Sequence, residues 1–257
     1  MNNVLRKRIA KMVYEAGDGH IPSAFSIVDI INAIYDRHLR FDPQNPEWPE
    51  RDYFILSKGH GCLALYVVLE KHGFISEHDL NMFSKKGGIL GEHPDATKVP
   101  GIEASTGSLG HGFPFAMGIA LGLRLRNMTN KVCVLVGDGE CHEGTVWEAA
   151  NVANNLELGN LLVIVDRNRS AEQLMPKDDL PAKWRAFGWN TVEINGHSAS
   201  EIDNALSSFE ARPRGAPTVL IAETVKGRGV PMIEGHGPWH HRIPDEREMG
   251  EIMEALS

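Results

Sequence analysis

Two apolar runs of the sequence are each followed at once by a polar side chain that could bind a metal ion. Residues 132–136 lead into Gly137-Asp138-Gly139, and residues 161–165 lead into Asp166-Arg167-Asn168. Asp138 supplies a carboxylate, and Asn168, thirty residues further on, supplies an amide oxygen. Such oxygens suit a hard cation like Mg²⁺, which keeps few protein ligands and completes its shell with phosphate. The pair therefore predicts a metal and phosphate site.

The surroundings of Asp138 suit a phosphate as well as a metal. Gly139 lets the backbone approach a phosphate and offers its N–H, and a helix expected from Thr145 would direct its N-terminus to the same place. The tripeptide alone is a common turn, since Gly17-Asp18-Gly19 is identical but follows a helical pattern. Only the second copy follows an expected strand, as a site at a strand tip requires.

The elements that would carry these residues alternate along the chain. Ser23 is expected to cap the second helix, and residues 83–112, rich in glycine and proline, are expected to form a functional loop. The expected strands are residues 51–57, 132–136, 161–165, 191–194 and 218–221, and the expected helices include 63–71, 115–125, 145–156 and 246–256. Apolar strands alternating with helices predict one doubly wound, three-layer α/β domain over residues 1–257, with a mainly parallel sheet.

Composition and charge exclude several classes of protein. The chain has 257 residues, of which 42% are hydrophobic, so a sizeable core can form and disorder or coiled coil is excluded for the whole. A net charge of −8 disfavours a bulk nucleic-acid binder. Three cysteines do not make a disulfide framework and favour a reducing compartment. Because neither a signal segment nor a membrane-length apolar run is present, we expect a cytoplasmic protein without membrane or nucleic-acid partners.

Several further motifs, together with Asp138 and Asn168, resemble the N-terminal, thiamine diphosphate-binding portion of transketolase. The thiamine diphosphate motif is Gly-Asp-Gly followed about thirty residues later by Asn, and the similarity extends over nearly the whole chain. The matching segments, in order, are residues 17–20, 57–61, 92–95, 106–112, 137–144, 183–189 and 226–230. Each segment alone is a weak signal, but their shared order is a strong one.

The resemblance implies roles for the matching positions. The metal, Mg²⁺ or else Ca²⁺ or Mn²⁺, would be held by Asp138, Asn168 and a main-chain oxygen near Ser170. The cofactor would be bound by His60, Gly107, Leu109, Gly137, Asp138, Gly139, Asn168 and His240. The sugar substrate would face His20, His93 and His240, and Glu143 would lie at a subunit interface within a relay of carboxylates.

The chain departs from the family pattern at several positions. His111 stands where the family often has Gln, Ser108 where it often has Pro, and Ser170 where a bulky aliphatic residue usually packs near the thiazolium. The C-terminal histidines are displaced enough that His241 could replace His240. These departures bear on substrate identity more than on cofactor binding.

We expect the chain to lack the second α/β domain that, in this family, binds the pyrimidine ring of the cofactor and supplies its activating glutamate. The resemblance therefore implies the N-terminal subunit of a split transketolase, inactive alone and working with a C-terminal partner subunit, with a heterotetramer as the family expectation. The implied reaction is thiamine diphosphate-dependent transfer of a two-carbon ketol unit from a ketose or its phosphate to an aldose or its phosphate.

Other interpretations compete with this one. A second carbon–carbon bond-forming class, related to 1-deoxyxylulose phosphate synthase, and a non-catalytic regulatory paralogue both fit the fold. His236, His240 and His241 suggest zinc, but glycine and proline among them oppose the helix that their spacing would need. His197 is expected to be a turn residue.

Overall fold

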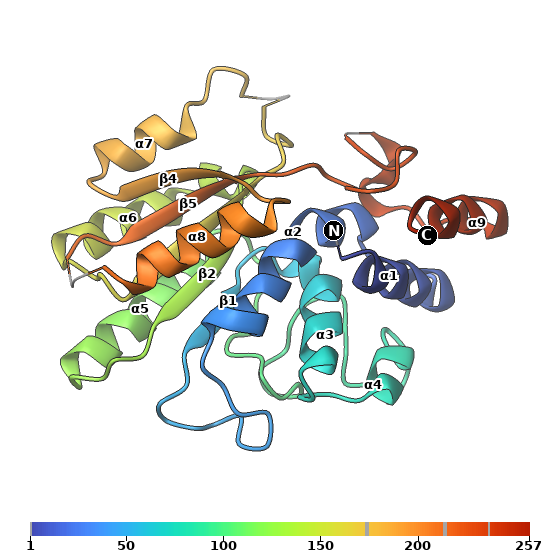
Figure 1. Cartoon of the computed structure of the whole chain (residues 1–257), viewed down its shortest axis with the longest axis horizontal. Coiled ribbons are helices and arrows are strands. Elements are labelled where there is room, and N and C mark those ends of the chain that lie inside the picture. Colours follow the sequence, from blue (N-terminus) through green and yellow to red (C-terminus); the bar gives the residue numbers. More distant parts are fainter. Residues whose placement is uncertain (1, 173–174, 213–214, 236) are drawn as a thin grey trace.

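The structure, a computed structural model, describes residues 2–172, 175–212, 215–235 and 237–257. Across these ranges, five strands form one parallel sheet in the order β1-β2-β3-β5-β4 (Figure 1). The strands are β1 (Tyr53–Leu56), β2 (Val132–Gly137), β3 (Leu161–Arg167), β4 (Asn190–Asn195) and β5 (Thr218–Glu223). The predicted parallel, doubly wound α/β fold is therefore confirmed.

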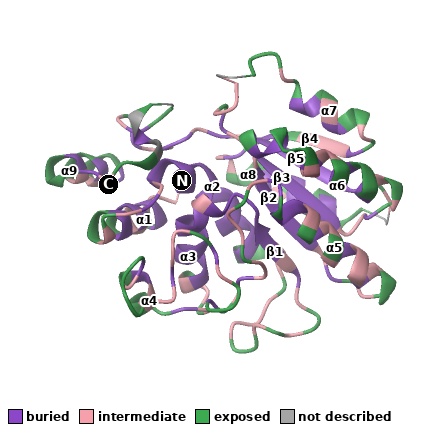
Figure 2. Ribbon diagram, turned by 180° about the vertical axis from the view of Figure 1, so that it is seen from behind, coloured by how far each residue is buried: buried purple, intermediate pink, exposed green. Residues whose placement is uncertain are grey.

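Helices cover both faces of this sheet, which makes three layers (Figure 1). The helices on one side are α1 (Asn3–Ala16), α2 (Ile21–Ala33), α3 (Cys62–Lys71), α4 (Glu77–Asn81), α8 (Ala199–Glu210) and α9 (Glu246–Ala255). Of these, α1 packs against α2 and α3, α4 against α3, and α9 against α1. The other side carries α5 (Gly112–Leu125), α6 (Gly144–Asn155) and α7 (Leu180–Ala186). The first and last helices, α1 and α9, lie side by side (Figures 1 and 2).

The apolar runs of the sequence are the central strands because both of their faces are buried. In β2, Cys133 and Leu135 join the core beneath α2 and α3, while Val134 and Val136 join the core beneath α5 and α6. Side chains alternate between the two faces of a strand, so a strand covered on both sides needs apolar residues at every position. Figure 2 shows this buried sheet between its two helical layers.

The prediction that Ser23 caps the second helix is wrong. Helix α2 begins at Ile21, with His20 at the N-cap position and a proline in its first turn. Proline is favoured in the first turn of a helix, as at Pro22, because its fixed φ suits a helix and the N–H that it lacks would have had no partner there. Ser23 is instead buried inside the helix, and His20 lies at the helix start.

The long loop predicted over residues 83–112 is present, although its last residue, Gly112, already begins α5. Hydrogen bonds to α3 and to β1 hold it in place. Tyr66 donates to the carbonyl oxygens of Gly91 and His93 at 2.9 and 3.0 Å, and Thr106 donates to the carbonyl of Leu56 at 2.6 Å. The loop is thereby fixed beside the carboxyl end of β1.

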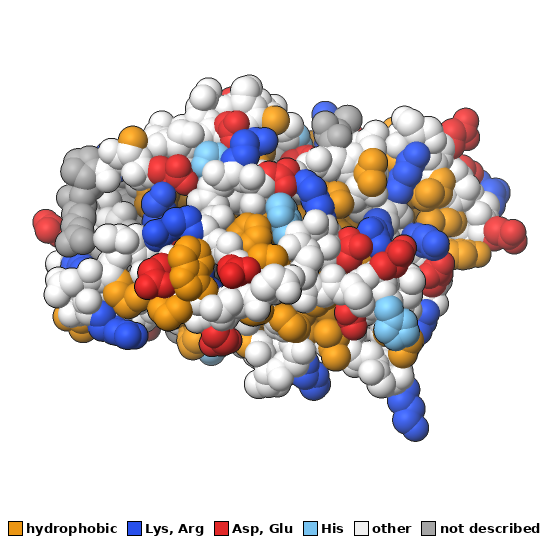
Figure 3. Space-filling model, turned by 60° about the horizontal axis from the view of Figure 1, so that its bottom comes forward, with side chains coloured by type: hydrophobic (Ala, Val, Ile, Leu, Met, Phe, Trp, Pro, Cys, Tyr) orange, Lys and Arg blue, Asp and Glu red, His pale blue; other side chains and the backbone are white. Residues whose placement is uncertain are grey.

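The surface carries charge of both signs. Figure 3 shows one face on which acidic and basic side chains are interspersed. All three cysteines are buried and free, as expected for a chain without a disulfide framework. Within the described ranges no helix is long and apolar enough to cross a membrane.

Replacing Leu162 with alanine tests the double burial of the central strands. Leu162 is 1% exposed in β3, so its loss should lower the free energy of unfolding by about 2–5 kcal/mol. The matched change Leu125→Ala removes a leucine that is 72% exposed and should cost less than about 0.5 kcal/mol. Urea unfolding of both variants measures the difference, and equal losses would contradict the assigned burial.

Candidate functional site

The tips of β2 and β3 lie side by side, as the sequence predicts for two neighbouring parallel strands. Gly137 is in register with Asp166, and the N–H of Asp138 donates to the carbonyl of Asp166 at 3.1 Å. A cavity of about 350 Å³ opens beyond these tips. Its lining residues are Ser23, Lys58, His60, Leu109, Gly137, Asp138, Gly139, Glu140, Asn168, Ser170, Lys226 and Gly237.

Asp138 has one carboxylate oxygen that no hydrogen bond satisfies. Its Oδ1 accepts the N–H of Gly139 at 2.7 Å, and the backbone of Ala171 also favours the ionised carboxylate, but no donor completes a hydrogen bond to the buried Oδ2. Burial, followed by the nearby charge of Asp166, raises the pKa of Asp138. A buried carboxylate oxygen without a donor is costly, so this atom suits a bound cation. The Gly139 N–H, which we expected to face a phosphate, is occupied here by Asp138.

Asp166 is the centre of the site and was not singled out from the sequence. Its side chain is fully buried. Lys58 Nζ lies 2.5 Å from its Oδ2, Ser26 donates to the same oxygen at 2.9 Å, and Thr224 donates to Oδ1. Burial alone would raise the pKa of Asp166, but the charge and hydrogen bond of Lys58 outweigh it and lower the pKa. The carboxylate is thus held ionised in the protein interior.

Asp166 also orients the amide of Asn168. The Asn168 Nδ2 donates to Asp166 Oδ2 at 2.8 Å, which directs the amide oxygen to the opposite side. There Oδ1 accepts the N–H of Ser170 at 3.1 Å and its hydroxyl at 2.6 Å. The amide oxygen is therefore available only if the Ser170 hydroxyl turns away. Metal ligation by Asn168 and by the main chain of Ser170 stays a prediction.

Glu140 is a second buried acid that sequence reasoning missed. Its Oε1 accepts the Ser57 hydroxyl at 2.5 Å and the Gly110 N–H at 2.8 Å, and its Oε2 accepts the Gly137 N–H at 3.1 Å. Burial raises its pKa despite these donors. Glu140 thus joins the loop before α5 to the tips of β1 and β2. Its position within the matched segment 137–144 could have indicated it, but in that segment the only glutamate given a role was Glu143.

Glu143 lies elsewhere. It is exposed and occupies the N-cap position of α6, where its side chain makes no capping hydrogen bond. Its Cβ and Cγ crowd the space beside Gly110, where an added methyl group would come within 2.6 Å of the Cβ. The structure does not bring Glu143 into the cavity lining among the described residues. Its place at a subunit interface stays a prediction.

Two lysines line the cavity, together with the acids Asp138 and Glu140. Lys58 is buried and paired with Asp166, while Lys226 Nζ lies 3.5 Å from the Ser170 hydroxyl. Burial, followed by the nearby charge of Lys58, lowers the pKa of Lys226. Two cationic groups converging on one cavity suit a multiply charged anion. Both lysines belong to segments that the sequence singled out, but neither was assigned a role.

Three histidines form a row that leads away from the cavity. His60 lines the cavity, the His20 ring lies 5.6 Å from the His60 ring, and the His241 ring lies 4.6 Å from the His20 ring. The predictions for His60 and His20 concern residues that the fold does bring together. His240 belongs to the same short helical turn as His241, but its side chain lies outside the described part of the structure.

Two carboxylates face the outer end of this histidine row. His241 Nε2 lies 3.4 Å from Asp18 Oδ1 and 3.5 Å from Glu92 Oε1. The hydrogen bond between the two acids raises the pKa of Glu92 and lowers that of Asp18. Ligand atoms of His20, Glu92 and His241 lie within 4.8 Å of one another. This row is therefore rich in groups that exchange protons and hydrogen bonds with hydroxyls.

His93 and Gly107 pack against each other in the long loop. At Gly107, where φ is +155°, an added Cβ would come within 2.8 Å of His93 Cδ2, so only glycine fits beneath this ring. His93 is exposed, and in the described structure it is not part of the cavity lining. Leu109, two residues beyond Gly107, does line the cavity. The predicted contact of His93 with a sugar stays a prediction.

The chain is similar in sequence to known proteins. The family described as transketolase, thiamine diphosphate binding domain, matches residues 1–256. An apulose-4-phosphate transketolase subunit of Phocaeicola vulgatus is 38% identical over 257 residues, covering 98% of this chain and 91% of its own. A 6-deoxy-6-sulfo-D-fructose transketolase subunit of Clostridium sp. is 38% identical over 238 residues, covering 91% and 86%.

Solved structures agree in fold. Transketolase from Campylobacter jejuni superposes with a TM-score of 0.92 at 29% identity, covering 99% of this chain and 42% of that one. Transketolase from Leishmania mexicana gives a TM-score of 0.91 at 26% identity, covering 99% and 40%. The chain thus spans about two fifths of the length of these solved transketolases.

Asp166→Asn tests whether one buried charge organises the cavity. The change leaves the Lys58 ammonium buried without its counter-charge, which should lower the free energy of unfolding by about 3–5 kcal/mol. The double variant Asp166→Asn/Lys58→Met should recover much of that loss. Asp203→Asn, which changes an exposed carboxylate paired with Arg37 and His38, should lower the stability far less than Asp166→Asn does, because surface ion pairs contribute little. Urea unfolding measures all three, and a loss for Asp166→Asn no larger than the surface control would contradict this role.

Proposed function

Because the chain belongs to the transketolase family through its thiamine diphosphate-binding domain, we propose that it is one subunit of a two-chain transketolase. The reaction transfers a two-carbon ketol unit from a ketose or its phosphate to an aldose or its phosphate. In this proposal the chain supplies the site for the diphosphate and the metal. A second chain supplies the rest of the active site.

The observation that carries this proposal is the unpaired, buried Oδ2 of Asp138 beside a cavity that also holds lysines. A divalent cation would satisfy that oxygen, and the proposed ligands are Asp138, Asn168 and the main chain of Ser170. Mg²⁺ fits best, since it binds through one or two protein oxygens and completes its shell with phosphate. Lys226 would meet part of the remaining charge of a diphosphate, while Lys58 stays paired with Asp166. The residues present therefore fit a metal-bound diphosphate.

Thiamine diphosphate, when bound, supplies the nucleophilic carbon used to break and make carbon–carbon bonds. The contribution of this chain is binding, orientation and proton handling. His60 lies at the cavity, where its ring can hydrogen-bond a phosphate oxygen. We assign His20 and His241 to sugar hydroxyls, because imidazoles exchange protons with hydroxyls near neutral pH. His93, at the edge of the loop that carries Leu109, would face the same substrate.

Two observations support a partner chain. The relatives from Phocaeicola vulgatus and Clostridium sp. are both named as subunits, whereas the solved transketolases are single chains of more than twice this length. Helix α5 also exposes Phe115 (52%) and Leu125 (72%), and Gly118 and Gly122 lie between them with open space above. An exposed apolar strip of this kind suits a protein interface. We propose a heterotetramer of two copies of each chain.

The carbon–carbon synthase alternative differs in its donor substrate. The named relatives are transketolase subunits for apulose-4-phosphate and 6-deoxy-6-sulfo-D-fructose, which supports a sugar rather than pyruvate as donor. If the chain were non-catalytic, Asp138, Asn168 and the lysines of the cavity would have no ligand to bind. We therefore keep ketol transfer as the proposed reaction.

Reconstitution tests the reaction directly. The purified chain is combined with a separately produced partner that carries a pyrimidine-binding domain, together with thiamine diphosphate, Mg²⁺, a ketose donor and an aldose acceptor. Ketol transfer should appear only when both chains are present. Transfer by this chain alone would refute the split-subunit proposal, and product formed from pyruvate instead of a ketose would favour the synthase alternative.

Asp138→Ala tests the metal site. Removal of the carboxylate should abolish Mg²⁺-dependent binding of thiamine diphosphate in calorimetric titration, because the cation loses its charged ligand. Asp203→Ala, a change on the exposed surface of α8, serves as the matched control and should bind like the unmodified chain. Equal affinity of Asp138→Ala and the control would rule out Asp138 as the ligand.

A further inference from the structure

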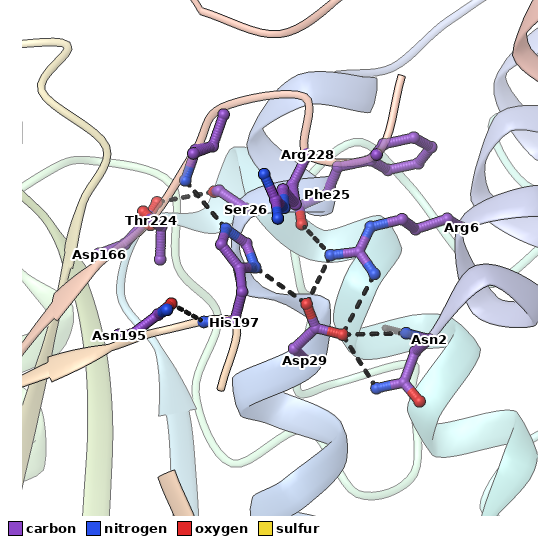
Figure 4. A network of polar contacts seen from close by, with 12 residues as sticks. Asn2, Arg6, Phe25, Ser26, Asp29, Asp166, Asn195, His197, Thr224 and Arg228 are labelled. Carbon is purple, nitrogen blue, oxygen red and sulfur yellow. Dashed lines mark hydrogen bonds and ion pairs between the residues drawn. The ribbon is translucent and has the colours of Figure 1, made fainter. Parts of the chain in front are cut away.

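His197 forms a buried bridge between two parts of the chain that are distant in sequence. It follows β4 in a turn, as expected, but only 7% of its side chain is exposed. Its Nδ1 lies 2.9 Å from Asp29 Oδ2 in α2 (Figure 4). Its Nε2 lies 2.9 Å from the backbone nitrogen of Val225 beyond β5. A turn residue with both ring nitrogens engaged in the interior acts as a connection rather than as a surface group.

The two contacts fix the protonation of the ring. The Val225 nitrogen is a backbone N–H and can only donate, so Nε2 must be the unprotonated acceptor. The proton then lies on Nδ1, which donates to the carboxylate of Asp29. The His197 ring is therefore neutral. It donates to Asp29 on one side and accepts a hydrogen bond from the segment after β5 on the other.

Asp29 is itself rigidly held. Arg6 donates to both of its oxygens, at 3.1 and 2.6 Å, and Asn2 donates to Oδ1 through its backbone and side-chain nitrogens (Figure 4). Arg6 is fully buried and also donates to the carbonyl of Phe25 at 2.9 Å. Burial would raise the pKa of Asp29, but the hydrogen bonds of His197 and Arg6 outweigh it and lower the pKa. His197 thus rests on a fixed, charged support.

The segment on the other side of His197 enters the cavity. Thr224 donates to the buried carboxylate of Asp166, the N–H of Val225 donates to His197, and the next side chain, Lys226, lines the cavity. Two consecutive residues are therefore anchored to two buried groups directly before the lysine. Fixing the backbone at Thr224 and Val225 sets the direction in which Lys226 leaves the chain.

We propose that His197 is a positioning residue that holds Lys226 against the anion site through the Val225 N–H. The proposal rests on the proposed function, since it takes the cavity to bind a diphosphate. Among the described residues His197 is not part of the cavity lining, so it acts through Lys226. The contacts from Arg6 to Asp29 and from Asp29 to His197 thereby let helices α1 and α2 influence how tightly the cavity binds its anion.

Two substitutions separate the two contacts of the ring. In H197Q the side-chain amide reaches the position of Nε2, so an acceptor for Val225 is kept and the contact with Asp29 is lost. In H197N the amide reaches only the position of Nδ1, so the contact with Asp29 is kept and the acceptor for Val225 is lost. If His197 positions Lys226, the glutamine variant must bind the anion better than the asparagine variant.

The test is calorimetric titration of the whole chain with pyrophosphate in the presence of Mg²⁺. H197N should bind about tenfold more weakly than the unmodified chain, and H197Q should lose less than about threefold, as expected for one hydrogen bond. In a K226M background, H197N should cause no further loss, because coupled residues are not additive. H38N changes a histidine that pairs with Asp203 and Glu210 and that, among the described residues, does not line the cavity, so it should leave the affinity unchanged.

The outcomes distinguish this inference from the proposed function. If the unmodified chain does not bind pyrophosphate with Mg²⁺, the proposed function of the cavity fails and this inference fails with it. If it binds, but H197N and H197Q lose equally or H197N and K226M are additive, only the positioning role is overturned. Should H197N not fold, ¹⁵N chemical shifts of the unmodified chain decide, since a proton on His197 Nε2 would overturn the inference.

Discussion

The ion pair between Asp166 and Lys58 is the interaction on which the candidate site depends. Both side chains are buried, and a charge in the interior is tolerated only beside a counter-charge and with its other hydrogen-bonding positions filled. Ser26, Thr224 and Asn168 fill them. The partners of Asp166 come from α2, from the segments after β1 and β5, and from the tip of β3. One carboxylate thereby fixes the relative positions of four separate segments at the cavity.

Charge of both signs is concentrated around this pair. Asp138 and Glu140 have raised pKa values chiefly because they are buried, and the pKa of Lys226 is lowered for the same reason. Each of these groups is thus held in a setting that disfavours its charged form. In our proposal a metal-bound diphosphate stabilises the charged forms of these buried groups, since the cation meets Asp138 and the phosphates meet Lys226. A site built in this way is selective for a ligand that carries both charges.

The departures from the transketolase pattern include one residue of this charged centre, Ser170, which lines the cavity. Ser170, in place of a bulky aliphatic residue, donates to the amide oxygen of Asn168 and so has a polar role. His241 pairs with Asp18 and Glu92 at the outer end of the histidine row. His60, proposed for the cofactor, lies beside His20, proposed for the sugar, with ring centroids 5.6 Å apart.

The sequence alone determined the central elements and the two strand tips, because those signals are local. Strands buried on both faces must be apolar throughout, and residues that follow parallel strands must share one edge of the sheet. That reasoning found Asp138 and Asn168. It did not find Asp166, two residues before Asn168, because nothing in the local sequence indicates that Lys58 meets it in the interior.

Only the tertiary structure decided which similar residues turn inward. Glu140 is buried and Glu143 is exposed, although both lie just after the same strand. Ser23 was expected to cap a helix, yet it is buried at the cavity because Pro22 starts the helix earlier. His197 looked like an ordinary turn residue until the fold placed Asp29 on one side and Val225 on the other. The physical reason is the same in each case: a polar side chain takes its role from partners that are distant in sequence, and folding alone brings them within hydrogen-bonding distance.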